Sequence, residues 1–232
     1  MAIKGFQGTS LVDYPGKMAA LIFFGGCNLT CPFCHNPALV IAPQELPDMP
    51  YELLLEELET RRGFIDGVVI TGGEPTLAKE LPDLLRQLRR LNLQIKLDTN
   101  GLLPDTLSEL INEKLLDLVA LDLKTAPHRY NELHSTPIAT DLLKQSIALL
   151  KGQKSCQVEF RTTCVPGLIG EKEIHLLGTS LSGAKEWSLQ QYAPGHALDP
   201  AWKELRPYSS ADLYQLARIA GTYVPTIHWR GR

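Results

Sequence analysis

The stretch Gly67-Val-Val-Ile-Thr-Gly-Gly-Glu-Pro75 contains a short apolar run that ends at a pair of glycines. A run of this length is typical of a buried strand, because a helix usually needs about ten or more residues. Gly72 and Gly73 end the strand, since a glycine pair interrupts regular structure. Residues at helical spacing then run from about Ala78 to Leu91. The stretch therefore predicts a strand followed by a helix.

The same pattern of a strand followed by a helix extends to both sides of this stretch. Further strands are predicted at 18–24, 93–97, 118–123, 157–162 and 186–190, and further helices at 51–61, 105–115, 141–151 and 171–181. Strands that alternate with helices favour a parallel sheet with right-handed crossovers. About six such units fit the chain, fewer than the eight of a closed TIM barrel. We therefore expect an α/β fold, a partial (β/α)6 TIM-like barrel with a mainly parallel sheet.

Length and composition limit the number of domains and the class of partner. The 232 residues are 44% hydrophobic, so we expect a single domain over 1–232, with an N-terminal lead-in at 1–17 and a C-terminal extension at about 191–232. A formal net charge of −3 offers no basic surface for a nucleic acid or an anionic membrane. The N-terminus lacks a signal-peptide layout, and no apolar run approaches the roughly 18 residues of a membrane span. We expect a cytoplasmic protein with neither kind of partner.

Three of the five cysteines, Cys27, Cys31 and Cys34, lie close together directly after the strand predicted at 18–24. They are too close for a normal disulfide framework. Three thiolates on one loop suit an iron–sulfur cluster and leave one iron without a protein ligand. A zinc site is the alternative, although such sites normally have four protein ligands and His35 is poorly placed as the fourth. A reactive or merely buried set of thiols is the third possibility.

Polar motifs also follow the ends of other predicted strands. These are Thr71-Gly-Gly-Glu-Pro75, Asp98-Thr-Asn-Gly101, Asp122-Leu-Lys124 and Arg161. Active sites of such barrels gather at the carboxyl ends of the strands, so one shared mouth can hold all of these motifs. Asp122 and Lys124 point to the same side of their strand, because side chains alternate along it. Each motif taken singly has a structural alternative: a glycine turn at Gly72-Gly73, an Asx turn at Asp98-Thr-Asn-Gly101 and a solvated rim pair at Asp122 and Lys124.

The spacing Cys27-x3-Cys31-x2-Cys34, with an aromatic Phe33 before the last cysteine, resembles the signature of the radical S-adenosylmethionine (SAM) superfamily. The resemblance implies one [4Fe–4S] cluster with these three cysteines as its ligands and as the catalytic centre. It also implies that SAM chelates the open iron and that an electron from the reduced cluster cleaves SAM to methionine and a 5′-deoxyadenosyl radical. Phe33 would then pack near the adenine of SAM.

The other strand-end motifs resemble the SAM-binding motifs of the same superfamily. Gly72, Gly73 and Glu74 resemble the GGE motif, which binds the SAM amino group. The DTNG and DLK motifs resemble those of the activating enzymes of glycyl radical enzymes, in which two aspartates help to form a cation-assisted site for the SAM carboxylate. The resemblance implies cofactor contacts, with a monovalent cation near the two aspartates, at Asp98, Thr99, Asn100, Asp122, Lys124 and, in an R-x-x-x-V-P-G segment, Arg161.

Two further segments narrow the family. Gly5-Phe-Gln-Gly-Thr-Ser-Leu-Val-Asp-Tyr-Pro-Gly-Lys17 resembles the opening of anaerobic ribonucleoside-triphosphate reductase activating proteins. Cys34-His-Asn-Pro37 resembles a segment that these proteins share with pyruvate formate-lyase activating enzyme, and it adds His35 and Asn36 to the candidate cofactor contacts. A single cluster is expected, because no cysteine occurs between His35 and Thr71. The resemblance implies an oxidoreductase that makes a glycyl radical on a partner, first of all class III ribonucleotide reductase, with an electron donor such as flavodoxin or ferredoxin.

Three alternatives stay open at this point. The chain could activate another glycyl radical enzyme such as pyruvate formate-lyase, or it could be a small-molecule radical SAM enzyme resembling 7-carboxy-7-deazaguanine synthase. It could also be a zinc-stabilised binding protein without enzymatic activity. Cys156 and Cys164 are expected to be ordinary buried cysteines. Tyr192 and His196 follow a predicted strand, but the sequence assigns them no role.

Overall fold

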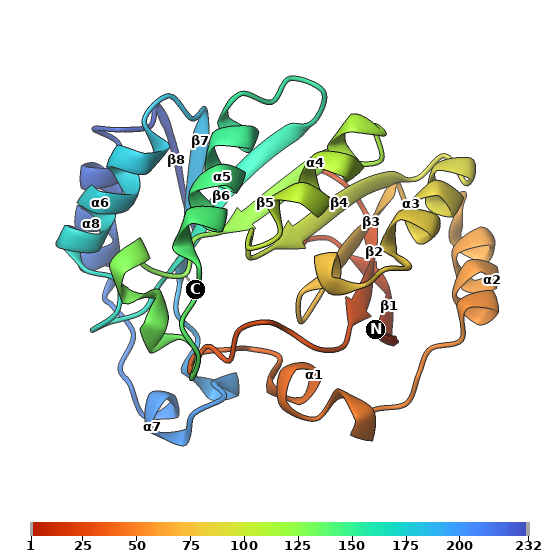
Figure 1. The fold of residues 1–232 in the computed structure, drawn as a ribbon, viewed down its shortest axis with the longest axis horizontal. Coiled ribbons are helices and arrows are strands. Elements are labelled where there is room, and N and C mark those ends of the chain that lie inside the picture. The colour runs from red at the N-terminus through yellow and green to blue at the C-terminus, as the bar shows by residue number, and fades with distance from the viewer. Residues whose placement is uncertain (1, 231–232) are drawn as a thin grey trace.

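The computed structural model of the chain describes residues 2–230. Its centre is one eight-stranded sheet whose strands follow each other in chain order (Figure 1). β1 is antiparallel to β2, and every later neighbour is parallel. Because β1 and β8 are the two edges of the sheet, the barrel is open. The strands are β1 (Ile3–Ser10), β2 (Ala19–Phe24), β3 (Gly67–Gly72), β4 (Gln94–Thr99), β5 (Leu118–Asp122), β6 (Gln157–Cys164), β7 (Glu186–Gln191) and β8 (Thr226–Arg230).

Helices join most consecutive strands and lie along the outside of the curved sheet (Figure 1). The longer ones are α2 (Tyr51–Arg61), α3 (Leu81–Arg90), α4 (Pro104–Asn112), α5 (Thr140–Lys151), α6 (Glu171–Leu181) and α8 (Ser210–Ala220). The shorter elements are α1 (Pro37–Ile41), α7 (Pro200–Lys203) and the 3-10 helices η1 (Pro43–Glu45), η2 (Pro75–Leu77), η3 (Pro127–Glu132) and η4 (Pro194–His196). Within residues 2–230, no helix combines the length and the apolar character that crossing a bilayer requires.

The predicted partial barrel is confirmed, and its sheet is larger than the sequence indicated. The six predicted strands are β2 to β7, and the helices predicted at 51–61 and 171–181 are α2 and α6. The lead-in and the C-terminal extension, however, contribute the edge strands β1 and β8. Sequence patterning misses β1 because an edge strand that is only partly buried needs no continuous apolar run, and this strand also contains Gly5 and Gly8.

The polarity of the side chains on the inner face of the sheet changes along the strands. A small apolar cluster packs there at the amino ends, and its members are Tyr14, Ala19, Leu21, Val69, Leu118 and Ala120. Two-residue alternation then places Asp98 and Asp122 further along the same face. Arg161 on β6 is in register with Asp122 on β5, so opposite charges meet across neighbouring strands. The inner face is therefore apolar at one end and charged at the other.

The ends of β2 and β3 approach each other so closely that no side chain fits between them. Gly72 has a φ of 120°, in the region that favours glycine. A Cβ on Gly73 would lie 1.9 Å from the backbone oxygen of Gly26. The amide of Glu74 donates a hydrogen bond to that same oxygen at 2.8 Å. The glycine pair thus sets the distance between β3 and the loop that follows β2.

Replacing Gly73 with alanine is expected to lower the free energy of unfolding by roughly 1–3 kcal/mol, because the new methyl group overlaps a backbone oxygen. Gly63→Ala is the matched control, since nothing lies within 4 Å of a Cβ at that position. Urea unfolding of both variants and of the parent chain measures the difference. Equal stability of the two variants would contradict the close approach of β3 to Gly26.

Candidate active site

A cavity of about 950 Å³ lies at the carboxyl ends of the strands. Every site residue predicted from the sequence lines it: Cys27, Cys31, Phe33, Cys34, His35, Asn36, Gly72, Gly73, Glu74, Asp98, Thr99, Asn100, Asp122, Lys124 and Arg161. They come from β6 and from the ends of β2, β3, β4 and β5 with the loops that follow them. Parallel strands explain this convergence, because all their carboxyl ends meet at the same edge of the sheet.

The three predicted ligand cysteines lie on the cysteine loop, which we define as residues 25–36 between β2 and α1. The loop is tied to distant backbone, since the amide of Thr30 donates to the carbonyl of Leu133 at 3.2 Å. A turn within it is closed by the amide of Cys34, which donates to the carbonyl of Cys31 at 2.9 Å. Cys31 is buried, whereas Cys27 and Cys34 are partly exposed. All three therefore border one cavity from a fixed loop.

Burial makes two of these thiols weak acids in the cluster-free chain. It raises the pKa of Cys27 to about 11 and the pKa of Cys31 to about 12. The cation of Lys124 opposes this effect at both sulfurs, but it does not overcome burial. Both thiols are therefore protonated at neutral pH, and a metal that binds them must displace their protons.

The carboxylate of Glu74 is engaged within the protein. Glu74 is 1% exposed, and its Oε1 accepts hydrogen bonds from the hydroxyls of Thr76 and Thr99 at 2.5 and 2.8 Å. Oε2 accepts from the amide of Asn100 at 2.7 Å. Burial raises the pKa of this carboxyl, and these hydrogen bonds counteract part of the rise. Glu74 thus ties the end of β3 to the end of β4.

Asn28 is a residue of the site that sequence analysis missed. Its side-chain oxygen accepts from Nδ2 of Asn100 at 2.7 Å, so the DTNG motif reaches the cysteine loop directly. The same Nδ2 lies 3.8 Å from the sulfur of Cys27. No sequence pattern marks this contact, because the two asparagines meet only after β2 and β4 have paired with β3.

A second missed residue is Lys96, which belongs to a row of five alternating charges. The row runs Lys96, Asp98, Arg161, Asp122 and Lys124. Nζ of Lys96 lies 2.5 Å from Asp98, and the guanidinium of Arg161 bridges Asp98 and Asp122 at 3.2 and 2.7 Å. Nζ of Lys124 lies 2.9 Å from Asp122 and completes the row. We call these five residues the charged row.

The pairing in the charged row keeps Asp122, Arg161 and Lys124 ionised. Burial alone would raise the pKa of Asp122, but Arg161 and Lys124 outweigh burial and hold that pKa well below its usual range. Burial would likewise lower the pKa values of Arg161 and Lys124, yet the facing carboxylates hold both above their usual ranges. These three residues therefore present fixed charges to the cavity at neutral pH.

The segment after β7 covers one side of the cysteine loop, and sequence analysis left it without a role. The ring of Trp202 lies 6.1 Å from that of Phe33, centre to centre. The ring of Tyr192 lies 6.5 Å from that of His35, nearly parallel to it. The hydroxyl of Tyr192 donates to the carbonyl of Trp202 at 2.7 Å, which joins the two contacts. The C-terminal extension is thus a wall of the site.

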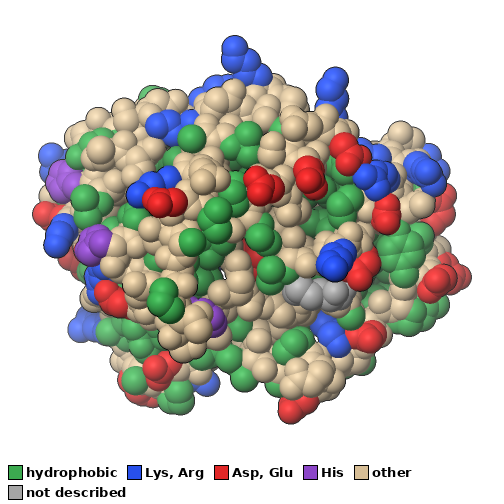
Figure 2. All heavy atoms as spheres, in the orientation of Figure 1, with side chains coloured by type: hydrophobic (Ala, Val, Ile, Leu, Met, Phe, Trp, Pro, Cys, Tyr) green, Lys and Arg blue, Asp and Glu red, His purple; other side chains and the backbone are tan. Residues whose placement is uncertain are grey.

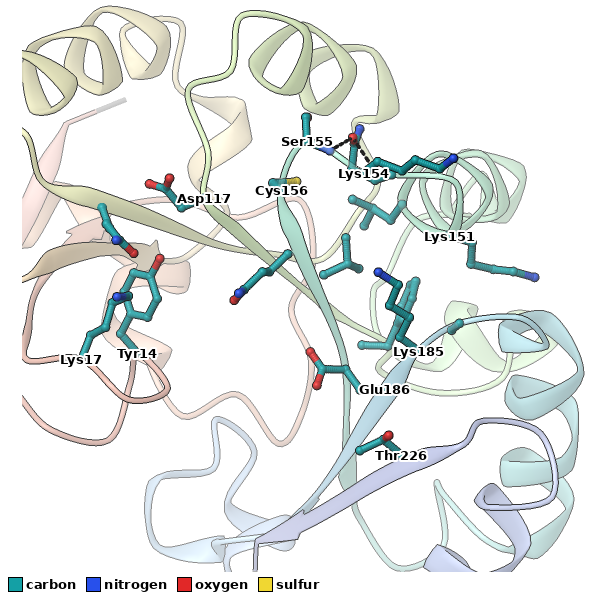
Figure 3. Close-up of a pocket in the computed structure, with 17 residues that line it drawn as sticks. Tyr14, Lys17, Asp117, Lys151, Lys154, Ser155, Cys156, Lys185, Glu186 and Thr226 are labelled. Carbon is teal, nitrogen blue, oxygen red and sulfur yellow. Dashed lines mark hydrogen bonds between the residues drawn. The ribbon is translucent and has the colours of Figure 1, made fainter.

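A second cavity, of about 750 Å³, lies at the other end of the strands (Figure 3). Figure 3 shows that Lys185 and Glu186 border it from the start of β7, with Cys156 on the approach to β6. None of the site residues predicted from the sequence lines it. Barrel active sites lie at the carboxyl ends of the strands, so the candidate active site is the larger cavity.

Replacing Glu74 with alanine is expected to lower the free energy of unfolding by about 3 kcal/mol, because it leaves several buried donors unpaired. Glu109→Ala is the control, since Glu109 is an exposed glutamate on α4. Thermal and urea unfolding compare the two variants with the parent. A loss of stability no larger than that of the control would mean that the hydrogen bonds from Glu74 to the end of β4 do not stabilise the fold.

Comparison with known proteins gives the family. Residues 21–178 match the Radical SAM superfamily. A protein of Methanocaldococcus jannaschii, provisionally named a glycyl-radical enzyme activating enzyme, is 32% identical over 231 residues, which cover 97% of this chain and 94% of the relative. The pyruvate formate-lyase 1-activating enzyme of Escherichia coli is 30% identical over 186 residues, covering 76% of this chain and 73% of the relative.

A solved structure supports the fold. The chain superposes on Streptococcus suis SuiB bound to its precursor peptide with a TM-score of 0.67 and 20% identity, over 91% of this chain and 48% of SuiB. At that identity the likeness extends to the fold alone. The sequence matches go further, because one spans more than half of the chain and another nearly all of it. The chain therefore belongs to the radical SAM superfamily, and it is an enzyme of the kind that includes the glycyl-radical enzyme activating enzymes.

Proposed function

We propose that this enzyme generates a glycyl radical on a partner enzyme, and that the partner is an anaerobic (class III) ribonucleoside-triphosphate reductase. The observation that carries the proposal is that three thiols from one loop border the same cavity as Asp98, Asp122, Lys124 and Arg161 of the charged row. The nearly full-length match to a protein named as an activating enzyme supports the reaction. The resemblance of the opening segment, residues 5–17, supports the choice of partner.

The donor set fits an iron–sulfur cluster. Cys27, Cys31 and Cys34 would each bind a different iron of a [4Fe–4S] cubane. Within residues 2–230, no three His, Cys, Asp or Glu side chains are placed to share a single metal ion, as a zinc site would require. Cluster and SAM together supply the one-electron cleavage of SAM to methionine and a 5′-deoxyadenosyl radical, which takes the Cα hydrogen of the partner's glycine.

The chain's own residues bind and orient SAM in this proposal. The backbone at Gly72 and Gly73 borders the cavity and accepts hydrogen bonds from the SAM ammonium, because the carboxylate of Glu74 is already engaged. Lys124 and Arg161 are the cations that face the SAM carboxylate. Thr99 and Asn100 line the same side of the cavity and complete the polar contacts.

The aromatic residues of the cysteine loop bind the adenine. Phe33 and His35 line the cavity, and each has an aromatic neighbour in the segment after β7. Nδ2 of Asn36 donates to the carbonyl of Gly72 at 3.4 Å, which holds the end of the loop beside the glycine pair. These contacts limit the movement of the rings and so favour one orientation of the nucleoside.

The electron donor, the location of the enzyme and its other partners complete the proposal. The electron comes from a small redox protein such as flavodoxin or ferredoxin, and the enzyme works in the cytoplasm. Charged side chains of both signs are scattered over the face shown in Figure 2, so that face offers no basic patch to a nucleic acid. The family resemblance implies a monovalent cation beside Asp98 and Asp122, and SAM binding in different salts, described below, tests for it.

A small-molecule radical SAM enzyme, similar to 7-carboxy-7-deazaguanine synthase, is the second candidate. The cavity of about 950 Å³ favours it, because sites for small molecules span about 300–1,000 Å³. SAM itself occupies part of that volume in either case. We prefer the activase, since the match to the archaeal relative extends over the whole length of both chains.

Anaerobic electron paramagnetic resonance distinguishes these candidates. Reconstituted and reduced enzyme is expected to show a cluster signal that changes when SAM is added. Addition of a class III ribonucleotide reductase should then produce a glycyl radical doublet. A cluster that responds to SAM without that doublet would reject this partner. Product formed from a pterin substrate without any partner protein would favour the small-molecule enzyme.

Cys31→Ala is expected to lose the cluster, and with it SAM cleavage, because only two thiols of the loop remain. The barrel should stay folded, since the cysteine loop lies outside the sheet. Cys156→Ala is the matched control, because that cysteine lines the second cavity. Iron and sulfide analysis, visible absorbance of the cluster and circular dichroism separate the outcomes. Stoichiometric zinc with no iron in the parent enzyme would contradict the cluster assignment.

A further inference from the structure

The charged row supplies a cationic donor to each oxygen of its two aspartates. Oδ1 of Asp98 accepts from Lys96 at 2.5 Å, and Oδ2 accepts from Arg161 at 3.2 Å. Oδ1 of Asp122 accepts from Arg161 at 2.7 Å, and Oδ2 accepts from Lys124 at 2.9 Å. Each of the four carboxylate oxygens therefore already holds an N–H from a cationic side chain.

Lys96 is the least expected member of the row. Its residue is only 1% exposed, whereas surface lysines keep their ammonium groups in water. A buried ammonium is costly unless a carboxylate pairs with it, and its partner is Asp98, two positions along the same strand and on the same face. Lys96 lies deeper in the barrel than Asp98, so its ammonium group binds the carboxylate on the side that faces away from the cavity.

The charges at the cavity leave little reason for an added metal ion. Each carboxylate of the row lies between two cations, Asp98 between Lys96 and Arg161 and Asp122 between Arg161 and Lys124. Glu159 is buried on the same face of β6 as Arg161, where it accepts from the hydroxyl of Ser188 and adds to the negative charge that holds the pKa of Arg161 above its usual range. A monovalent ion at the two aspartates would have to displace charged donors, or it would lie beside them and be repelled.

We propose that the charged row, without a bound monovalent metal ion, holds the carboxylate of SAM, and that Lys96 is the positioning residue that keeps Asp98 in the row. Lys124 and Arg161 contact the ligand carboxylate, and the two aspartates fix the direction of these cations. The inference rests on the proposed function, because it takes SAM as the ligand of this cavity. It replaces the cation-assisted site that the family resemblance implies with one built from side chains.

The first test needs no variant. SAM binding to the reconstituted enzyme is measured by calorimetry in sodium, potassium or ammonium salts and in choline chloride, at constant ionic strength. The dissociation constant is expected to change less than about threefold among these salts. Binding that is tighter by more than that factor in sodium, potassium or ammonium than in choline overturns the inference but leaves the proposed function intact. Absence of SAM binding in every salt, with the cluster intact, rejects the proposed function itself.

The second test removes the positioning lysine. Lys96→Met is expected to weaken SAM binding by roughly tenfold with unchanged iron content, because Asp98 loses one of its two donors. Sodium or potassium should then restore part of the affinity, since the freed oxygen of Asp98 can bind a metal ion. That new salt dependence would not arise if Lys96 were merely part of the core.

Two further variants complete the second test. Lys96→Arg should keep the affinity of the parent, because it preserves the charge beside Asp98. Lys79→Met is the control, since Lys79 is an exposed lysine outside the cavity. Parent-like SAM affinity in Lys96→Met, or weakened binding that no salt restores, would overturn the role of Lys96. If that variant does not fold, the measurement on the parent enzyme still decides between the row and a metal ion.

Discussion

The contact between the end of β3 and the cysteine loop is the constraint on which the site depends. Because Gly73 has no side chain, the amide of Glu74 reaches the backbone oxygen of Gly26. The buried carboxylate of Glu74 then binds the end of β4, and Asn100 there reaches back to the cysteine loop. Hydrogen bonds therefore join the cysteine loop to the end of β3, the end of β3 to the end of β4, and the end of β4 back to the cysteine loop. A loop held in this way keeps its thiols in position before any cofactor binds, which lowers the cost of ordering them.

Open parallel barrels have an interior that must be filled without a complete ring of strands. Here the amino ends are filled by apolar side chains, and the carboxyl ends by charges that neutralise one another. Removing charges from water is expensive, so a buried row of this kind is tolerated only where each charge is paired. The benefit is a rigid electrostatic environment that needs no reorganisation when an anionic group arrives.

The wall formed by the segment after β7 lies beyond the part of the chain that matches the superfamily. The superfamily match ends at residue 178, before Tyr192 and Trp202. These residues nevertheless pack on the cysteine loop, and the amide of Asp199 donates to the carbonyl of Pro32 at 2.9 Å. The cysteine loop therefore lies within the part of the chain that matches the superfamily, whereas the wall that packs on it lies outside that part. A shared fold does not by itself fix the function of its members.

The sequence by itself determined the barrel, six of its strands and every candidate residue that marks a strand end. It could do so because hydrophobic periodicity and glycine breaks are local, and because parallel strands bring all their carboxyl ends together. Only the tertiary structure revealed β1 and β8, Asn28, Lys96 and the wall after β7. Edge strands carry no strong apolar pattern, and a buried lysine looks like any other lysine until its partner is placed. The role of Glu74 was likewise decided by burial, since its hydrogen-bond partners on β4 become neighbours only when the sheet has formed.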